Sequence, residues 1–163
     1  MMRIPEPALP VDERKREMRR VIYAHLSDGA TDMTLTRALD QLIERFNGCD
    51  GCSTCRMIQI GSSQQLSFAK QFILMRLVQE GLLNIQQHAR AHSSVLTLHY
   101  ETLMVTLTLQ DDGVGLLDGT HERPGVHALR AMQYCLTEFD GNLEVFEAEQ
   151  GGVVVRATLP LDE

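Results

Sequence analysis

The chain has 163 residues, a hydrophobic content of 44% and a formal net charge of -7 at pH 7. This length is enough for one well-buried domain with a short appendage, and the composition is that of an ordinary folded protein, with disorder expected only near the ends. The negative charge argues against nonspecific binding to nucleic acid. The sequence shows no apolar run of the roughly 20 residues that span a membrane and no apolar signal-peptide core, so a cytoplasmic location is expected.

The N-terminal part divides into a leader and a charged helix. Residues 1–12 contain three prolines without apolar periodicity and are predicted to be an extended, disordered leader. A helix is predicted over residues 13–26, and its narrow apolar stripe suits either a dimer seam or packing on the chain's own domain. We interpret residues 13–32 as a possible remnant of a dimerisation region and residues 33–163 as the main domain.

The main domain alternates helices with strands. Apolar residues at helical spacing predict helices at residues 34–46, 66–91 and 127–139. Met75, Val78, Leu82 and Ile85 share one face of the second helix, and Asp140-Gly141 is expected to end the third. Short alternating or turn-bounded segments predict strands at residues 56–60, 95–100, 103–110, 143–148 and 153–159, the last four as two hairpins. This order predicts an α+β fold, a two-layer sandwich in which a mixed, largely antiparallel sheet carries its helices on one face.

Glu80, Asn84 and His88 form a polar stripe on the longest predicted helix. Their i, i+4, i+8 spacing displaces each by about 40° around the helix from the one before. An asparagine amide oxygen and a carboxylate are ligands that a hydrated magnesium ion accepts alongside phosphates. The carboxylate could instead orient or deprotonate a nucleophile. The alternative is a solvated helix face with incidental polar residues.

A second motif, Asp111-Asp112-Gly113-Val114-Gly115, follows the first predicted hairpin. A carboxylate at a strand end can accept a hydrogen bond from an exocyclic amine, and the glycines let the backbone pass close under a flat base. Alone, the motif could be a turn, because Asp and Gly dominate turns. Both motifs in this order, with the hairpin between them, predict a nucleotide site.

The two motifs resemble the asparagine box and the first glycine box of the catalytic ATP-binding domain of two-component sensor histidine kinases. That domain belongs to a wider family with the gyrase, chaperone and mismatch-repair ATPases. The resemblance covers about residues 34–160 and is greatest to the nitrate-sensor subfamily. It implies that residues 33–163 bind ATP and Mg²⁺ and pass the γ-phosphate to a histidine of a dimerisation domain outside this chain or in a partner. It also implies a response regulator as partner, a possible homodimer and a possible origin in the cytoplasmic portion of a membrane sensor.

The resemblance assigns roles to single residues. Asp111 would accept from the adenine amino group, Gly113 and Gly115 would admit the base and sugar, and Asn84 would hold magnesium. Glu80 would be the catalytic base or an orienting residue. The cofactor-binding set would also include His88, His127 and Leu129.

Four positions depart from the family pattern. Gln87 replaces a lysine, Ala128 the second glycine of a later box, Cys135 an arginine and Val153 a threonine, while Gly125 is present but one residue out of register. These positions would handle phosphates or the lid, and a methyl group at Ala128 could block the approach of a phosphate. The resemblance therefore implies a protein histidine kinase catalytic domain with eroded phosphate-binding boxes. One alternative is a degenerate regulatory or binding module that keeps the fold without turnover.

The phosphoacceptor helix of the subfamily, with a His-Glu-Leu-His-Asp-like motif, has no counterpart in this sequence. His25 is the only histidine before the domain, and its flanks do not match. A second alternative is therefore a soluble kinase of the same superfamily that phosphorylates a protein serine, as anti-sigma factors do. The Gln79-Glu80 pair favours the histidine-kinase branch.

Cys49, Cys52 and Cys55 have C-x-x-C-x-x-C spacing in a glycine-containing turn. They could supply three thiolates to zinc or an iron–sulfur cluster, with a fourth ligand from Cys135 or another subunit. The alternative is a set of surface cysteines in a tolerant turn.

Overall fold

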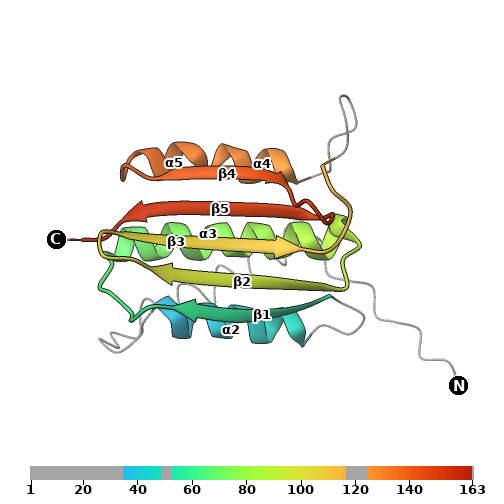
Figure 1. Cartoon of the computed structure of the whole chain (residues 1–163), viewed down its shortest axis with the longest axis horizontal. Helices are drawn as coiled ribbons and strands as arrows, with labels where there is room; N and C mark the ends of the chain where they lie inside the picture. Colours follow the sequence, from blue (N-terminus) through green and yellow to red (C-terminus); the bar gives the residue numbers. More distant parts are fainter. Residues whose placement is uncertain (1–34, 49–52, 117–124, 163) are drawn as a thin grey trace, which may run out of the picture. The chain divides into compact units, whose positions relative to one another are not determined.

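A computed structural model describes residues 35–48, 53–116 and 125–162, all within one compact unit. Five strands form one sheet in the order β1-β2-β3-β5-β4 (Figure 1). The strands are β1 (Thr54–Ile60), β2 (Ser93–Tyr100), β3 (Met104–Asp111), β4 (Asn142–Glu147) and β5 (Val153–Pro160). The helices are α2 (Leu35–Asn47), α3 (Phe68–Asn84), the π-helical turn η1 (Ile85–Ala89), α4 (Val126–Ala131) and α5 (Gln133–Thr137). The leader and helix predicted over residues 1–32 lie outside the described residues.

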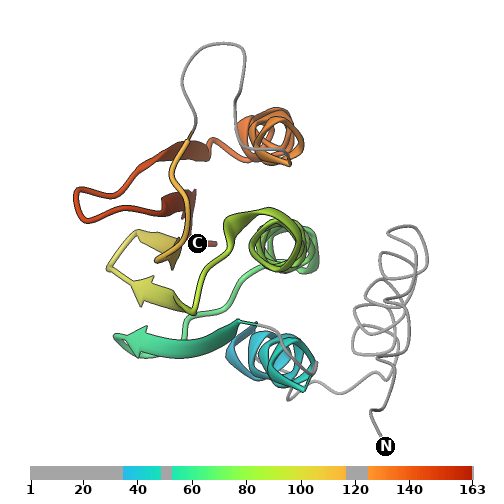
Figure 2. The ribbon, with the colours of Figure 1, turned by 90° about the vertical axis from the view of Figure 1, so that its right-hand side faces the viewer.

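The predicted two-layer α+β fold is confirmed. β1 pairs with β2 in parallel, and the pairs β2–β3, β3–β5 and β4–β5 are antiparallel, which gives a mixed sheet with both predicted hairpins. Figure 2 shows α2, α3 and the α4–α5 segment on the same face of the sheet. The core lies between these two layers.

Alternation along the strands determines which side chains enter this core. In β3 the side chains of Val105, Leu107 and Leu109 are buried, and the residues between them are partly exposed. Alternate residues of a strand point to the same face, so these three side chains meet the helices. Asp111 is the next residue in this series, and only 3% of its surface is exposed. The apolar stripe of β3 therefore ends in a buried carboxylate.

α3 packs against β3 and β5 in the middle of the sheet (Figure 1). The apolar face predicted for it, made by Met75, Val78, Leu82 and Ile85, is buried. Gly81 lets the helix approach β3 closely, since a Cβ at this position would lie 2.5 Å from Leu109 Cδ2. Close packing of helix on sheet therefore brings the end of α3 next to the end of β3.

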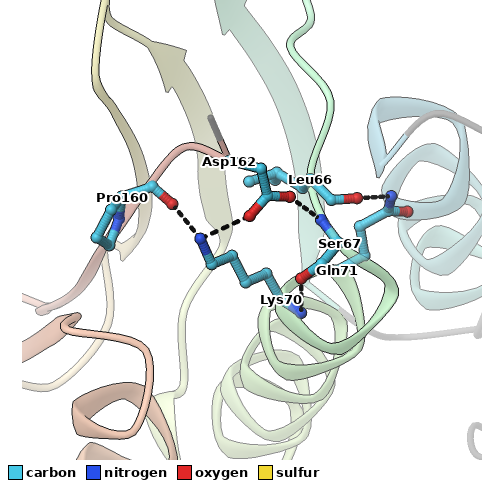
Figure 3. Close-up of polar contacts among 6 residues, drawn as sticks. All are labelled: Leu66, Ser67, Lys70, Gln71, Pro160 and Asp162. Carbon is cyan, nitrogen blue, oxygen red and sulfur yellow. Dashed lines mark hydrogen bonds and ion pairs between the residues drawn. The ribbon is translucent and has the colours of Figure 1, made fainter.

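The N-terminus of α3 is fixed to the C-terminal end of β5 (Figure 3). Lys70 Nζ donates to the Pro160 carbonyl at 2.8 Å and forms an ion pair with Asp162 Oδ1 at 2.8 Å. Asp162 also accepts from the Ser67 backbone N–H, one of the helix-start groups that lack a partner within the helix. The Lys70 hydrogen bond, followed by the Ser67 N–H, holds the pKa of Asp162 below its ordinary value.

The helix predicted over residues 66–91 differs from the structure at both ends. It begins at Phe68, because the Ser67 side chain accepts from the Lys70 backbone N–H as an N-cap. The α-helix ends at Asn84 and passes into η1, and Arg90 then adopts a left-handed conformation with φ 50°. The strand predicted at 56–60 begins two residues earlier, at Thr54.

The helix predicted over residues 127–139 is two short helices that meet at Met132. The Met132 N–H donates to the Leu129 carbonyl, an i to i−3 bond that tightens the turn. The predicted Asp140-Gly141 stop is present, but Asp140 rather than Gly141 has the positive φ, at 57°. Gly141 is needed for space, because a Cβ there would lie 2.7 Å from the Thr158 carbonyl oxygen.

The last residue of α2 bonds to the edge strand β1. Asn47 Nδ2 donates to the Cys55 carbonyl at 2.8 Å, and Asn47 Oδ1 accepts from the Cys55 N–H at 2.7 Å. One side-chain amide thus pairs with both backbone groups of Cys55, as a residue of a neighbouring strand would.

Candidate functional site at one end of the sheet

Asp111 is the centre of the candidate site. Its Oδ1 atom accepts from the Gly113 N–H at 3.0 Å and from the Val153 N–H at 3.4 Å. These donors belong to the loop after β3 and to the start of β5, so the carboxylate joins two neighbouring strands. Gly152 makes this contact possible, because a Cβ there would lie 1.9 Å from the Asp111 carbonyl oxygen and its φ is +85°. The buried acceptor is therefore held in a fixed position at the strand end.

Asp112 has a different role from its neighbour. Its carboxylate is exposed and accepts from the backbone N–H groups of His92 and Ser93, at 2.8 and 3.0 Å, and from the Ser93 hydroxyl at 3.0 Å. The Ser93 backbone N–H is the main cause that holds the pKa of Asp112 below its ordinary value. Asp112 therefore attaches the loop to the start of β2, and Asp111 faces the site.

Gly113 lies against the end of η1. A Cβ at Gly113 would be 2.0 Å from the Ala89 carbonyl oxygen, and the same oxygen accepts from the Val114 N–H at 2.7 Å. This close approach gives Gly113 a structural role inside the fold, in addition to the ligand role that the resemblance implies. Ala89 belongs to the matched asparagine box, but nothing in the sequence indicated this contact, because it is made by a backbone carbonyl.

Asn84 and His88 meet at the start of α4. A Cβ at Gly125 would lie 2.3 Å from Asn84 Nδ2 and 3.4 Å from His88 Cδ2. Asn84 is 3% exposed and His88 partly exposed. The polar stripe of Glu80, Asn84 and His88 was predicted on one α-helix, but His88 lies in the π-helical turn η1. Such turns occur often at functional sites. Gly125, which is out of register with the family pattern, is the residue that contacts both side chains.

The other predicted site residues lie at different depths. Glu80 is partly exposed on α3, and His127 and Ala128 are exposed on α4. The methyl group of Ala128 therefore lies open rather than packed against the fold. Leu129 is 1% exposed and belongs to the core of the described structure, which makes packing its observed role.

Two residues of the second hairpin were not assigned a binding role from the sequence, although the resemblance marked Val153 as a departure from the family pattern. Val153 donates to Asp111 and is 1% exposed. Glu147 lies opposite Val153 in the β4–β5 register, and its Oε1 would be 2.3 Å from a Cβ at Gly115. The sequence signal for both was the Gly151-Gly152 turn, which predicts that the strand ends meet but does not indicate which residues face the site.

The cysteine prediction is not supported for the residue that the structure describes. Cys55 is the second residue of β1 rather than part of a turn, and it is buried. Burial raises the pKa of its thiol. Cys49 and Cys52 lie outside the described residues. Across residues 35–48, 53–116 and 125–162, no three His, Cys, Asp or Glu side chains gather where they could hold a metal ion.

The fold matches solved histidine kinase domains. It aligns with the histidine kinase domain of the EL346 blue-light activated histidine kinase from Erythrobacter litoralis over 94% of this chain and 76% of that one, with a TM-score of 0.66 and 21% identity. It also aligns with the ATP binding domain of PrrB from Mycobacterium tuberculosis over 80% of this chain and 96% of that one, with a TM-score of 0.62 and 16% identity. This chain has the fold of a histidine kinase ATP-binding domain.

A sequence relative agrees with this histidine kinase fold. The signal transduction histidine-protein kinase/phosphatase DegS from Brevibacillus brevis is 25% identical over 145 residues, which are 89% of this chain. The chain spans 37% of the length of DegS. No protein-family model matches the chain. In the part of the chain that the structure describes, we find no helix long and apolar enough to cross a membrane.

Within the histidine kinase fold, the predicted residues gather at one end of the sheet. Five segments meet there: the end of β3, the start of β5, the end of β4, the end of α3 with η1, and the start of α4. Figure 2 views the molecule from this end. The two sequence motifs, some thirty residues apart, are therefore neighbours in space through the contact of Gly113 and Val114 with Ala89.

Proposed function

We propose that the chain is the ATP-binding catalytic domain of a sensor histidine kinase in two-component signal transduction. The observation that carries the proposal is the Asp111 carboxylate, 3% exposed at the end of an apolar strand. A buried carboxylate is costly unless hydrogen-bond donors face it. Two backbone N–H groups donate to this carboxylate and fix its position, and a carboxylate is an acceptor of matching chemistry for an exocyclic adenine amine. Membership of the nitrate-sensor subfamily is part of the same proposal.

The residues around Asp111 fit a nucleotide with a magnesium ion. Asn84 is a buried amide on the neighbouring helix, and its oxygen is a hard ligand of the kind that magnesium accepts beside phosphates. The Gly113 and Gly115 backbone lies on the loop that leaves Asp111, where a flat base would need a close approach. When bound, Mg-ATP would supply the phosphoryl group for transfer.

The work of this chain would be positioning and charge neutralisation. Asp111 would orient the base, Asn84 would hold the metal ion, and Glu80 on the more exposed side of α3 would orient or deprotonate the acceptor. His88, beside Asn84, would contribute to the same site, with His127 at the start of α4. Leu129 would support it through packing, because its side chain is in the core.

The acceptor would be a histidine of a dimerisation domain outside this chain or in a partner. The phosphorylated histidine would then serve a response regulator, and homodimerisation would bring the acceptor within reach of the site. We place this reaction in the cytoplasm, where ATP and response regulators would be available.

The test is calorimetric titration of ATP and ADP, with and without magnesium, into three forms of the chain. Asp111→Asn should abolish adenine nucleotide binding. The amide keeps the shape of the side chain, but it loses the negative charge and presents an N–H donor in place of one acceptor oxygen. Asp112→Asn is the matched control, since it removes the same charge from an exposed neighbour that bonds to β2. Asn84→Ala should weaken only the magnesium-dependent part. Equal nucleotide affinity in wild type, Asp111→Asn and Asn84→Ala would refute the site assignment.

Nucleotide binding without turnover is the main alternative. It is favoured by Val153, which offers a buried apolar side chain where the family has a threonine, and by the exposed Cys135 in place of an arginine. Incubation with radiolabelled ATP and candidate partners separates the functions. Label on a histidine protein supports the kinase, label on a serine supports an anti-sigma-factor-like kinase, and binding without label supports the regulatory module.

A further inference from the structure

We propose that Glu147 is a specificity-determining residue that accepts hydrogen bonds from the ribose hydroxyls of the bound nucleotide. The inference rests on the proposed nucleotide site and extends it to a strand that neither sequence motif includes. It follows from three observations: the row of residues at the end of the sheet, the contact of Glu147 with the loop, and the chemistry of a carboxylate.

Asp111, Val153 and Glu147 form a row across β3, β5 and β4. Glu147 lies opposite Val153 in the register, and the Val153 N–H donates to Asp111 Oδ1. Side chains directly opposite in an antiparallel pair share one face of the sheet. Val153 is buried on the helix-facing side, so the Glu147 side chain projects from that side too. Two strand spacings separate the backbone of the two acids by about 9.5 Å.

The Glu147 carboxylate lies beside the loop that begins at Asp111. Its Oε1 would be 2.3 Å from a Cβ at Gly115, so the carboxylate occupies the space that a side chain at this glycine would fill. Gly115 is the second glycine of the loop that begins at Asp111. The loop therefore begins at a buried acceptor, Asp111, and passes an exposed acceptor, Glu147 of β4, at Gly115.

This arrangement suits a purine nucleoside. An ionised carboxylate accepts hydrogen bonds and donates none, and its two oxygens can take two hydroxyl donors at once. Carboxylates in dinucleotide-binding folds bind ribose hydroxyls in this way. With the amino group at Asp111 and the apolar Val153 between the acids, the sugar would lie on the side of Glu147. The negative charge of Glu147 would also repel a 2′-phosphorylated ribose.

The test compares ATP, 2′-deoxy-ATP and 3′-deoxy-ATP by calorimetry. The wild-type chain should bind ATP roughly tenfold more tightly than the deoxynucleotides, the effect of losing a hydrogen bond to a charged group. In Glu147→Ala the three affinities should become equal, with 2′-deoxy-ATP bound as well as by the wild type. Glu144→Ala is the matched control, because it removes the same charge from β4 at a position paired with Arg156.

The outcomes separate this inference from the proposed function. Equal binding of the three nucleotides by the wild type, with ATP binding still lost in Asp111→Asn, would overturn the role of Glu147 and leave the ATP site intact. If Glu147→Ala still binds ATP more tightly than the deoxynucleotides, the role of Glu147 is likewise overturned and the ATP site is left intact. Failure of the wild type to bind ATP would overturn both proposals.

Discussion

Replacing Gly125 with alanine should displace the proposed magnesium ligand. Gly125 has φ +85°, and a Cβ there would lie 2.3 Å from Asn84 Nδ2, less than any real contact distance. A non-glycine residue in the left-handed region costs about 1–2 kcal/mol. Asn84 must also move, and a buried polar group that loses its partner costs about 1–3 kcal/mol more. We expect Gly125→Ala to lose about 2–5 kcal/mol of stability and at least about tenfold in magnesium-dependent ATP affinity, which is about 1.4 kcal/mol.

Gly151→Ala is the matched control for this prediction. Gly151 has a similar φ of +97°, but a Cβ there meets no described atom within 4 Å. It should cost only the backbone strain of about 1–2 kcal/mol and leave magnesium-dependent binding unchanged. Urea unfolding measures the free energy of unfolding, and calorimetry with and without magnesium measures the affinity. If Gly125→Ala binds Mg-ATP as tightly as Gly151→Ala does, the contact with Asn84 does not position a ligand.

Two further changes test the frame around the site. Gly113→Ala should lower the free energy of unfolding by about 2–4 kcal/mol, since a Cβ would lie 2.0 Å from the Ala89 carbonyl oxygen. An unchanged free energy of unfolding in urea would contradict the close contact between Gly113 and Ala89. Asp162→Asn should cost less than about 1 kcal/mol at neutral pH, because its ion pair with Lys70 is partly exposed. The pKa of Asp162 is lowered by Lys70, so its stabilisation is present above the ordinary carboxyl pKa of about 3.9 and lost as the pH falls below it. Urea unfolding of the wild type and Asp162→Asn at pH 7 and pH 3 should show that their difference in free energy of unfolding shrinks in acid. A larger difference at pH 3 would be contrary to this account.

The sequence allowed the sheet and the position of Asp111 at a strand end to be predicted because both depend on local pattern. Alternation in β3 indicates which face is buried, and Asp111 is in phase with Leu107 and Leu109. Helical spacing likewise predicted the buried face of α3. These signals need no knowledge of the neighbouring elements.

Two kinds of feature were not predictable: local changes of helix type and contacts between distant segments. The change from α-helix to π-helix after Asn84 has no propensity signal, and the split at Met132 follows from a single tightened turn. At the end of α5, the need for space beside the Thr158 carbonyl made Gly141 necessary, while Asp140 took the left-handed conformation. The position of Glu147 against Gly115 depends on the register of β4 and on the path of a loop, which composition does not reveal.

The hydrogen bonds between Asn47 and Cys55 bear on how this chain behaves beside other chains. β1 forms an edge of the sheet, and an edge strand offers N–H and C=O groups to any extended segment that approaches. The groups of Cys55 face outward, and by alternation so do those of Met57 and Gln59. Asn47 already occupies the first of these three positions with both a donor and an acceptor. An incoming strand therefore has a shorter stretch on which to pair, so the end of α2 protects the protein against edge-to-edge aggregation.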